Sequence, residues 1–111
     1  MSDVKINPDL IRLLDIKKAI LEIAEFYQDG LDDRKTIMAI SYSIAIIGEA
    51  ANKLSSELTT KHNHIPWKKI VGMRHRIIHD YGNVDIENLN QAVAFDLPKL
   101  ALQIDLILKN F

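Results

Sequence analysis

The spacing of apolar residues restricts this 111-residue chain to a helical fold. Strict alternation of apolar and polar residues, which is typical of a strand, is nearly absent, whereas intervals of three and four residues recur throughout. The clearest seam is expected to run through one helix and consists of Ile37, Ile40, Ile44, Ile47, Ala51, Leu54 and Leu58. We therefore predict an all-α, up-and-down bundle of four to five helices that forms a single domain over residues 1–111.

Capping residues predict where the first two helices begin and end. Asn7 can cap the first helix, with Pro8 in the opening turn, where a missing N–H costs nothing. Asp29–Gly30 is expected to end that helix. Either Asp32 or Asp33 then caps the second helix, which the apolar seam extends to Leu58.

The second half of the chain is expected to begin with a polar loop over residues 59–65. Pro66 then opens a third helix that continues to about Ile78. Asp85 is a plausible cap for the helical segment that follows. Because Pro98 does not fit a helix interior, we expect a final helix that Asp96 caps, with Pro98 in its first turn.

A stripe of small residues runs beside the apolar seam of the second helix and consists of Ser41, Ala45, Gly48 and Asn52. Small side chains allow another helix to approach closely. That helix belongs either to a second subunit or to the same bundle, and the sequence alone leaves both alternatives open.

Composition excludes several classes of protein. The net charge is −1, which argues against a protein that coats nucleic acid non-specifically. Because the chain has no cysteine, disulfide bonds and thiolate metal sites are excluded. No apolar run approaches the roughly 20 residues that span a membrane, so a membrane-spanning helix is not expected. Its first residues lack the layout of a signal peptide, so we expect a cytoplasmic protein that does not interact with a membrane.

The most informative stretch for function spans residues 74–81, which contain arginine, histidine and tyrosine in the order R-x-x-x-x-H-x-Y. No acidic residue occurs between Glu57 and Asp80. Five basic residues lie in that interval, namely Lys61, Lys68, Lys69, Arg74 and Arg76. This local positive charge predicts an anionic partner.

Arg74 and His79 carry the groups needed to cleave RNA through its own 2′-OH without a metal. The guanidinium can bind a phosphate and stabilise its transition-state charge, and the imidazole can transfer protons near neutral pH. On a regular helix the two side chains would lie about 140° apart. Either the helix is distorted at its end, or a second subunit completes the site. The competing interpretation is that both are surface residues favoured by the helix dipole.

Other residues near this motif have weaker interpretations. His75 and His79 have the i,i+4 spacing of a zinc pair, but the adjacent Arg74 and Arg76 would repel a metal ion, so we expect no metal site. Glu49 is either a carboxylate paired with a base such as Arg74 or an exposed helix residue.

Several short segments, taken in order, resemble the HepT-like branch of the HEPN superfamily. They are Ile46–Ile47–Gly48–Glu49–Ala50–Ala51, Ile65–Pro66–Trp67, Gly72–Met73–Arg74, Ile78–His79–Asp80–Tyr81 and Val84–Asp85. The resemblance covers nearly the whole chain. It implies a helical bundle that forms a homodimer, with the motif lining a cleft between the subunits. It also implies a metal-independent endoribonuclease without a cofactor, acting as the toxin of a toxin–antitoxin pair.

The resemblance assigns roles to individual residues. It makes Arg74 and His79 the catalytic pair. From their chemistry and position, His75, Arg76 and Tyr81 are candidates for binding the substrate phosphate, and Glu49 is a candidate supporting residue. The resemblance also makes Tyr81 the hydroxyl to which a partner nucleotidyltransferase antitoxin would attach AMP. The alternatives are a tyrosine that donates a hydrogen bond to a phosphate and one that only packs. His75 departs from the family, which usually has asparagine after the motif arginine. HEPN domains also include non-catalytic binding modules, so a scaffold that partners a nucleotidyltransferase is the alternative function.

Overall fold

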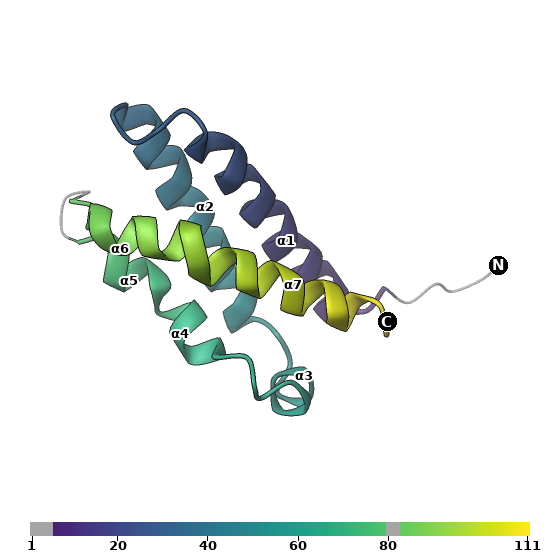
Figure 1. The fold of residues 1–111 in the computed structure, drawn as a ribbon. Coiled ribbons are helices and arrows are strands. Elements are labelled where there is room, and N and C mark those ends of the chain that lie inside the picture. Colours follow the sequence, from purple (N-terminus) through teal and green to yellow (C-terminus); the bar gives the residue numbers. More distant parts are fainter. Residues whose placement is uncertain (1–5, 80–82) are drawn as a thin grey trace.

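The computed structural model describes residues 6–79 and 83–111, and these residues form helices (Figure 1). The described part has no strand beyond one isolated antiparallel bridge between Ile78 and Val84. The elements in order are α1 (Pro8–Tyr27), α2 (Arg34–Asn52), α3 (Ser56–Lys61), α4 (Trp67–Val71), α5 (Met73–Ile77), α6 (Ile86–Gln91), a π-helical turn η2 (Ala92–Asp96) and α7 (Leu97–Leu108).

The helices pack as a bundle, which confirms the expected fold class. In Figure 1, α1 and α2 form an antiparallel hairpin, and the segment α6–η2–α7 crosses it. The short helices α4 and α5 pack on α2, and α7 contacts α1. Among the described residues, no helix is long and apolar enough to cross a membrane.

The predicted caps of three helices are confirmed. The side chains of Asn7, Asp33 and Asp85 accept hydrogen bonds from backbone N–H groups in the first turns of α1, α2 and α6. Each cap satisfies a donor that the helix itself leaves unpaired. Gly30 follows α1 with φ of +78°, a conformation that favours glycine.

The prediction that the second helix continues to Leu58 is wrong, because α2 ends at Asn52 and α3 follows it. Ser55 caps α3 by accepting a hydrogen bond from the Leu58 N–H. The carboxylate of Asp9, at the start of α1, accepts hydrogen bonds from both the backbone N–H and the hydroxyl of Ser55. With this local cap and the contact to Asp9, a new helix starts in the segment predicted to be helix and polar loop.

The predicted third helix is divided in two at Gly72, between α4 and α5. It also ends at Ile77, because Ile78 adopts extended backbone angles (φ −109°, ψ 115°). A β-carbon on Gly72 would lie 3.3 Å from the carbonyl oxygen of Lys68. The break therefore falls where glycine relieves crowding of the backbone.

Asp96 does not cap a final helix, which corrects another prediction. Its backbone is helical (φ −67°, ψ −46°) and its side chain makes no capping hydrogen bond. Instead, the chain continues from α6 through the wider turn η2 into α7, and the Leu97 N–H bonds to the Ala92 carbonyl. A π-helical turn before Pro98 accommodates the missing N–H and the bulk of the proline ring.

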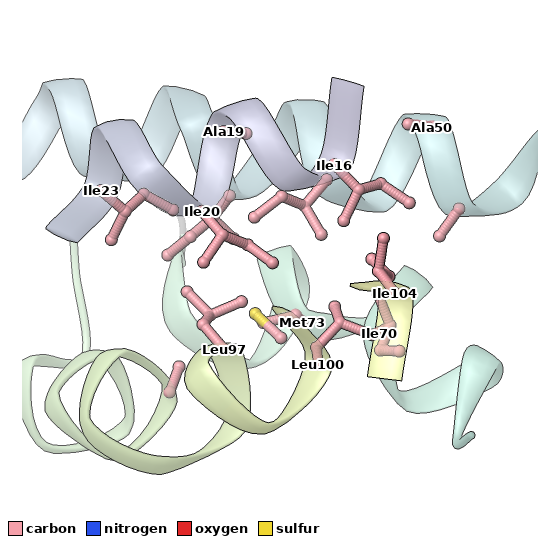
Figure 2. Close-up of a cluster of buried hydrophobic side chains, with 14 of the residues drawn as sticks. Ile16, Ala19, Ile20, Ile23, Ala50, Ile70, Met73, Leu97, Leu100 and Ile104 are labelled. Carbon is pink, nitrogen blue, oxygen red and sulfur yellow. The ribbon is translucent and has the colours of Figure 1, made fainter. Parts of the chain in front are cut away.

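The core lies between the α1–α2 hairpin and the segments α4–α5 and α7. Figure 2 shows Ile16 and Ile20 of α1 facing Met73 of α5 and Leu97 and Leu100 of α7. These five side chains are buried, with exposed fractions of 6% or less. The core thus fixes α5, which carries Arg74 and the first half of the sequence motif, from one side only.

The stripe of small residues on α2 has a partner within the chain. A β-carbon on Gly48 would lie 3.2 Å from the carbonyl oxygen of Val71 in α4. Gly48 is buried, whereas Asn52 at the end of the stripe is exposed. At Gly48, the helix that approaches α2 closely is therefore α4 of the same bundle.

Candidate functional site

The motif residues lie at the end of α5 and in the segment that follows it. Arg74 is the second residue of α5, and the Ile78 N–H donates a 2.7 Å hydrogen bond to its carbonyl oxygen. Ile78 itself is extended. After it, the His79 N–H donates to the Asn83 carbonyl at 2.6 Å, and the Asp85 N–H donates to the Ile77 carbonyl at 2.7 Å. These bonds fix the backbone of His79 beside the last turn of α5.

The end of α5 changes how Arg74 and His79 are placed. Because His79 follows the helix, the 140° separation of a regular helix does not apply to it. Completion of the site by a second subunit stays a prediction. Both side chains are exposed. For the same reason His75 and His79 do not form an i,i+4 pair on one helical face.

Three consecutive basic residues of α5 point in different directions. Met73 and Ile77 are buried, so they mark the side of α5 that faces the core. Successive residues are turned by about 100°, which directs Arg74 to one flank, His75 outward and Arg76 to the other flank. Arg74 and His75 are exposed, and Arg76 is half-buried.

Arg76 has a structural partner on its flank. Its Nη1 donates a 2.8 Å hydrogen bond to the carbonyl oxygen of Lys69, just before the break at Gly72. Its own carbonyl accepts a hydrogen bond from the Asn88 side chain of α6 at 3.3 Å. Arg76 therefore links α4, α5 and α6, a role that the sequence did not predict.

The other two predicted site residues have different outcomes. Glu49 is exposed on α2 and makes no ion pair with any described basic residue, which agrees with the interpretation as an exposed helix residue. Tyr81 lies outside the described residues. Its predicted role therefore depends on the sequence.

The positive charge of the motif is not neutralised by described carboxylates. Two ion pairs occur in residues 6–79 and 83–111, and both are elsewhere: Arg12 with Asp15, and Lys17 with Asp105. Arg74, with its side chain exposed, is thus free of any described acidic partner. Within the same residues, no three histidine, aspartate or glutamate side chains lie together as metal ligands.

Two more histidines lie in the segment between α3 and α4, apart from the motif. The ring centroids of His62 and His64 are 6.1 Å apart in an edge-to-face arrangement. Partial burial lowers the pKa of His62, and the charges of Lys61 and His64 lower it further. The His62 carbonyl accepts a hydrogen bond from the Trp67 indole at 3.1 Å, so this segment anchors the start of α4.

A cavity of about 100 Å³ lies on the flank of α5 that carries Arg76. Its floor is apolar and its rim is charged. The lining residues are Pro66, Lys69, Ile70, Met73, Arg76, Asp96, Lys99, Leu100 and Gln103. Lys69 of α4 and Arg76 of α5 are seven residues apart, a spacing that the sequence shows. No pattern in the sequence links these two residues to Lys99, because the turn η2 shifts the helical phase of α7.

The sequence of the chain matches the model of a known family. The family described as Ribonuclease HepT-like matches residues 16–107, which include the entire motif helix and most of the core. The chain belongs to the HepT-like family. This confirms the resemblance inferred from the sequence. No solved structure gives a significant match.

Curated relatives of this HepT-like protein include archaeal and bacterial sequences. A probable ribonuclease HepT from Thermococcus cleftensis is 38% identical over 93 residues, covering 79% of this chain and 84% of the relative. A putative RNase from Caldanaerobacter subterraneus subsp. tengcongensis is 35% identical, covering 76% of this chain and 75% of the relative. A Methanocaldococcus jannaschii protein named gamma-glutamylcyclotransferase and putative RNase is 37% identical, covering 85% of this chain and 45% of the relative.

Proposed function

We propose that this HepT-like protein is a metal-independent endoribonuclease in which Arg74 and His79 are the catalytic residues. The observation that carries the proposal is the end of α5. There the two side chains are exposed and close in sequence, on a backbone that is hydrogen-bonded in place. The names of the relatives, which are ribonucleases or putative RNases, support RNA as the substrate.

The proposed reaction uses the 2′-OH of RNA as the nucleophile. His79 accepts the proton of that hydroxyl as its oxygen attacks the adjacent phosphorus. The bond from phosphorus to the 5′-oxygen breaks, and the leaving oxygen takes a proton from a second acid, so the products are a 2′,3′-cyclic phosphate and a 5′-OH end. Arg74 binds the phosphate and stabilises the negative charge that increases on it in the transition state.

Substitution of His79 by alanine tests this mechanism. We expect His79→Ala to lower the cleavage rate of single-stranded RNA roughly 10²–10⁴-fold, because proton transfer by a positioned side chain contributes about that much. Cleavage by the unaltered protein should persist in EDTA. His64→Ala, which removes an exposed histidine outside the motif, is the matched control and should keep the original rate.

The opposite results would assign a different function to the protein. If EDTA abolishes cleavage, the reaction depends on a metal ion and the proposed mechanism is wrong. If the purified protein binds RNA but His79→Ala and the unaltered chain both leave it intact, the protein is a binding module, which is the alternative function.

The proposal extends to the cellular role, where it depends on the family resemblance. We place the protein in a cytoplasmic toxin–antitoxin pair, as a homodimer whose partner is a nucleotidyltransferase antitoxin. Tyr81 follows His79 by two residues, so an AMP attached to its hydroxyl would bring a phosphodiester next to the catalytic pair. That group would compete with the RNA phosphate for Arg74 and exclude substrate by charge and volume.

Co-expression with the cognate transferase tests this regulation. The intact mass of the protein should rise by one AMP unit, and RNA cleavage should fall together with the fraction modified. Tyr81→Phe should prevent the mass increase, whereas Tyr42→Phe, which alters an exposed tyrosine on α2, should not. A mass increase that survives Tyr81→Phe would assign the modification to another residue.

A further inference from the structure

The cavity beside Arg76 combines an apolar floor with a basic rim. Ile70, Met73 and Leu100 form the floor and are buried, with exposed fractions of 2–4%. Figure 2 shows these three side chains together between α4, α5 and α7. Because these three residues belong to the core, the floor is built from the packing of α4, α5 and α7.

Three different elements supply the basic groups of the rim. Lys69 comes from α4, Arg76 from α5 and Lys99 from α7. The hydrogen bond from the Arg76 Nη1 to the Lys69 carbonyl holds the first two segments together. The fold, rather than a local run of basic sequence, therefore brings these three cations together.

The rim keeps a positive charge. Asp96 is its single acidic residue, so three cations face one carboxylate. Asp96 forms no ion pair within 4.0 Å with any of the three, and none of the three pairs with another described carboxylate. This excess of positive charge on the rim favours a bound anion.

The size of the cavity restricts the anion. Sites that enclose a whole small-molecule ligand usually measure about 300–1,000 Å³. A cavity of about 100 Å³ is too small for a complete nucleotide but admits the oxygens of one phosphate group. Lysine and arginine side chains are the usual partners of such a group.

The position of the cavity relates it to the proposed catalytic pair. Arg74 and Arg76 point to opposite flanks of α5, about 200° apart around the helix, and exposed His75 lies between them. A chain that crosses α5 from Arg74 to the cavity covers about one helix width, on the order of 10 Å. Three consecutive basic side chains line that path, and no described carboxylate pairs with them.

We infer that this cavity binds a backbone phosphate of the RNA a few nucleotides from the scissile phosphate, which Arg74 binds on the other flank of α5. The inference rests on the proposed function and adds a substrate site to it. The cavity fixes the register of the RNA across α5, and it contacts phosphate rather than bases, so it contributes affinity without sequence preference.

The test measures RNA affinity in a His79→Ala background, which prevents cleavage. The double variant Lys69→Gln/Lys99→Gln removes two rim charges and keeps the Arg76 hydrogen bond. We expect binding of single-stranded RNA to weaken on the order of tenfold. The slope of log K against log salt should fall by about 0.7, since one phosphate contact on a single strand contributes about that much. The matched control, Lys18→Gln/Lys53→Gln, removes two exposed lysines outside the cavity and should change affinity much less.

A set of RNA oligonucleotides, each with one neutral methylphosphonate linkage, then locates the contact. In the His79→Ala protein, neutralising one linkage a few nucleotides from the cleavage position should weaken RNA binding. In the Lys69→Gln/Lys99→Gln variant that position should become insensitive, while the linkage at the cleavage position stays sensitive.

Two results would overturn the inference. The first is a double variant with unchanged affinity and an unchanged set of sensitive linkages. If it occurs while the unaltered protein cleaves RNA through His79, only the assignment of the cavity is wrong. The second is an unaltered protein that does not bind RNA, which refutes the proposed function as well.

Discussion

At the scale of single residues, neighbours in the sequence have separate tasks because the helix turns them apart. Arg74 and His75 are exposed, whereas Arg76 is half-buried and bonded to the Lys69 carbonyl. Positive charge alone therefore does not identify a substrate contact in this motif. The carbonyl that Arg76 satisfies lies next to the break at Gly72, so part of the basic character of the segment stabilises the fold.

His62 gives the protein a pH-dependent stability that is separate from the motif. Its pKa in the folded protein is lowered from the ordinary value of 6.5, first by partial burial and then by Lys61 and His64. Between the lowered pKa and about 6.5, the unfolded chain binds more protons than the folded one. The free energy of unfolding should therefore fall as the pH decreases from 7 through this window.

Urea denaturation at a series of pH values checks this prediction. His62→Gln should flatten the change in the window, and Lys61→Gln should reduce it, because each removes a cause of the difference. Lys53→Gln alters an exposed lysine outside this segment and serves as the control. A dependence that stays the same in His62→Gln would assign the effect to other groups.

At the scale of elements, packing of α4 on α2 places the motif helix. Gly48 allows this approach, because a β-carbon would lie 3.2 Å from the Val71 carbonyl oxygen. Gly48→Ala gains up to about 1 kcal/mol of helix propensity. The contact it creates is with backbone rather than with a flexible side chain, and overpacking of this kind costs about 1–3 kcal/mol.

We expect Gly48→Ala to lower the free energy of unfolding by about 1 kcal/mol, because the overpacking outweighs the propensity. Gly48→Val should cost more, since it adds further atoms against the same carbonyl. Asn52→Ala, at the exposed end of the same stripe, should stay within about 0.5 kcal/mol of the original protein. Thermal or urea unfolding followed by circular dichroism measures all three, and a Gly48→Ala variant more stable than its parent would contradict the packing argument.

The sequence predicts a helix start where a nearby side chain caps it. It does not predict an interruption of a helix whose cause lies elsewhere in the fold. Asn7, Asp33 and Asp85 each bond to an N–H two or three residues ahead, a relation visible in the sequence. The start of α3 was missed although Ser55 makes the same local cap with the Leu58 N–H. The bond of Ser55 to Asp9, 46 residues away, left no pattern in the sequence. The turn η2 is a second example. Pro98 indicates that the regular helix is interrupted nearby, but it does not show whether a new helix cap or a wider helical turn accommodates the proline.

At the scale of the whole molecule, the sequence indicated the catalytic candidates but not their surroundings. Arg74 and His79 stood out because they lie in one short basic stretch. The cavity of Lys69, Arg76 and Lys99 could not be predicted, because its third cation comes from a helix whose phase is set by η2. Residues that act within one segment leave a pattern in the sequence, whereas a site assembled from three elements requires the fold.

The last prediction concerns the proposed homodimer and its shared cleft. Two copies of the motif that meet on a twofold axis would supply two histidines, one as base and one as the acid that protonates the leaving oxygen. Both His79 side chains would then be required in each cleft. A subunit with His79→Ala should therefore inactivate the intact subunit with which it pairs.

Subunit mixing distinguishes this shared site from two independent ones. Intact and His79→Ala subunits are mixed in equal amounts and allowed to exchange. The cleavage rate of the mixture is then compared with that of the intact protein at the same total protein concentration. A shared cleft leaves about one quarter of the activity, because only dimers of two intact subunits are active, whereas independent sites leave about one half. Light scattering at micromolar concentration must show a dimer, and a monomer that cleaves RNA would contradict the shared cleft directly, since one chain supplies only one His79.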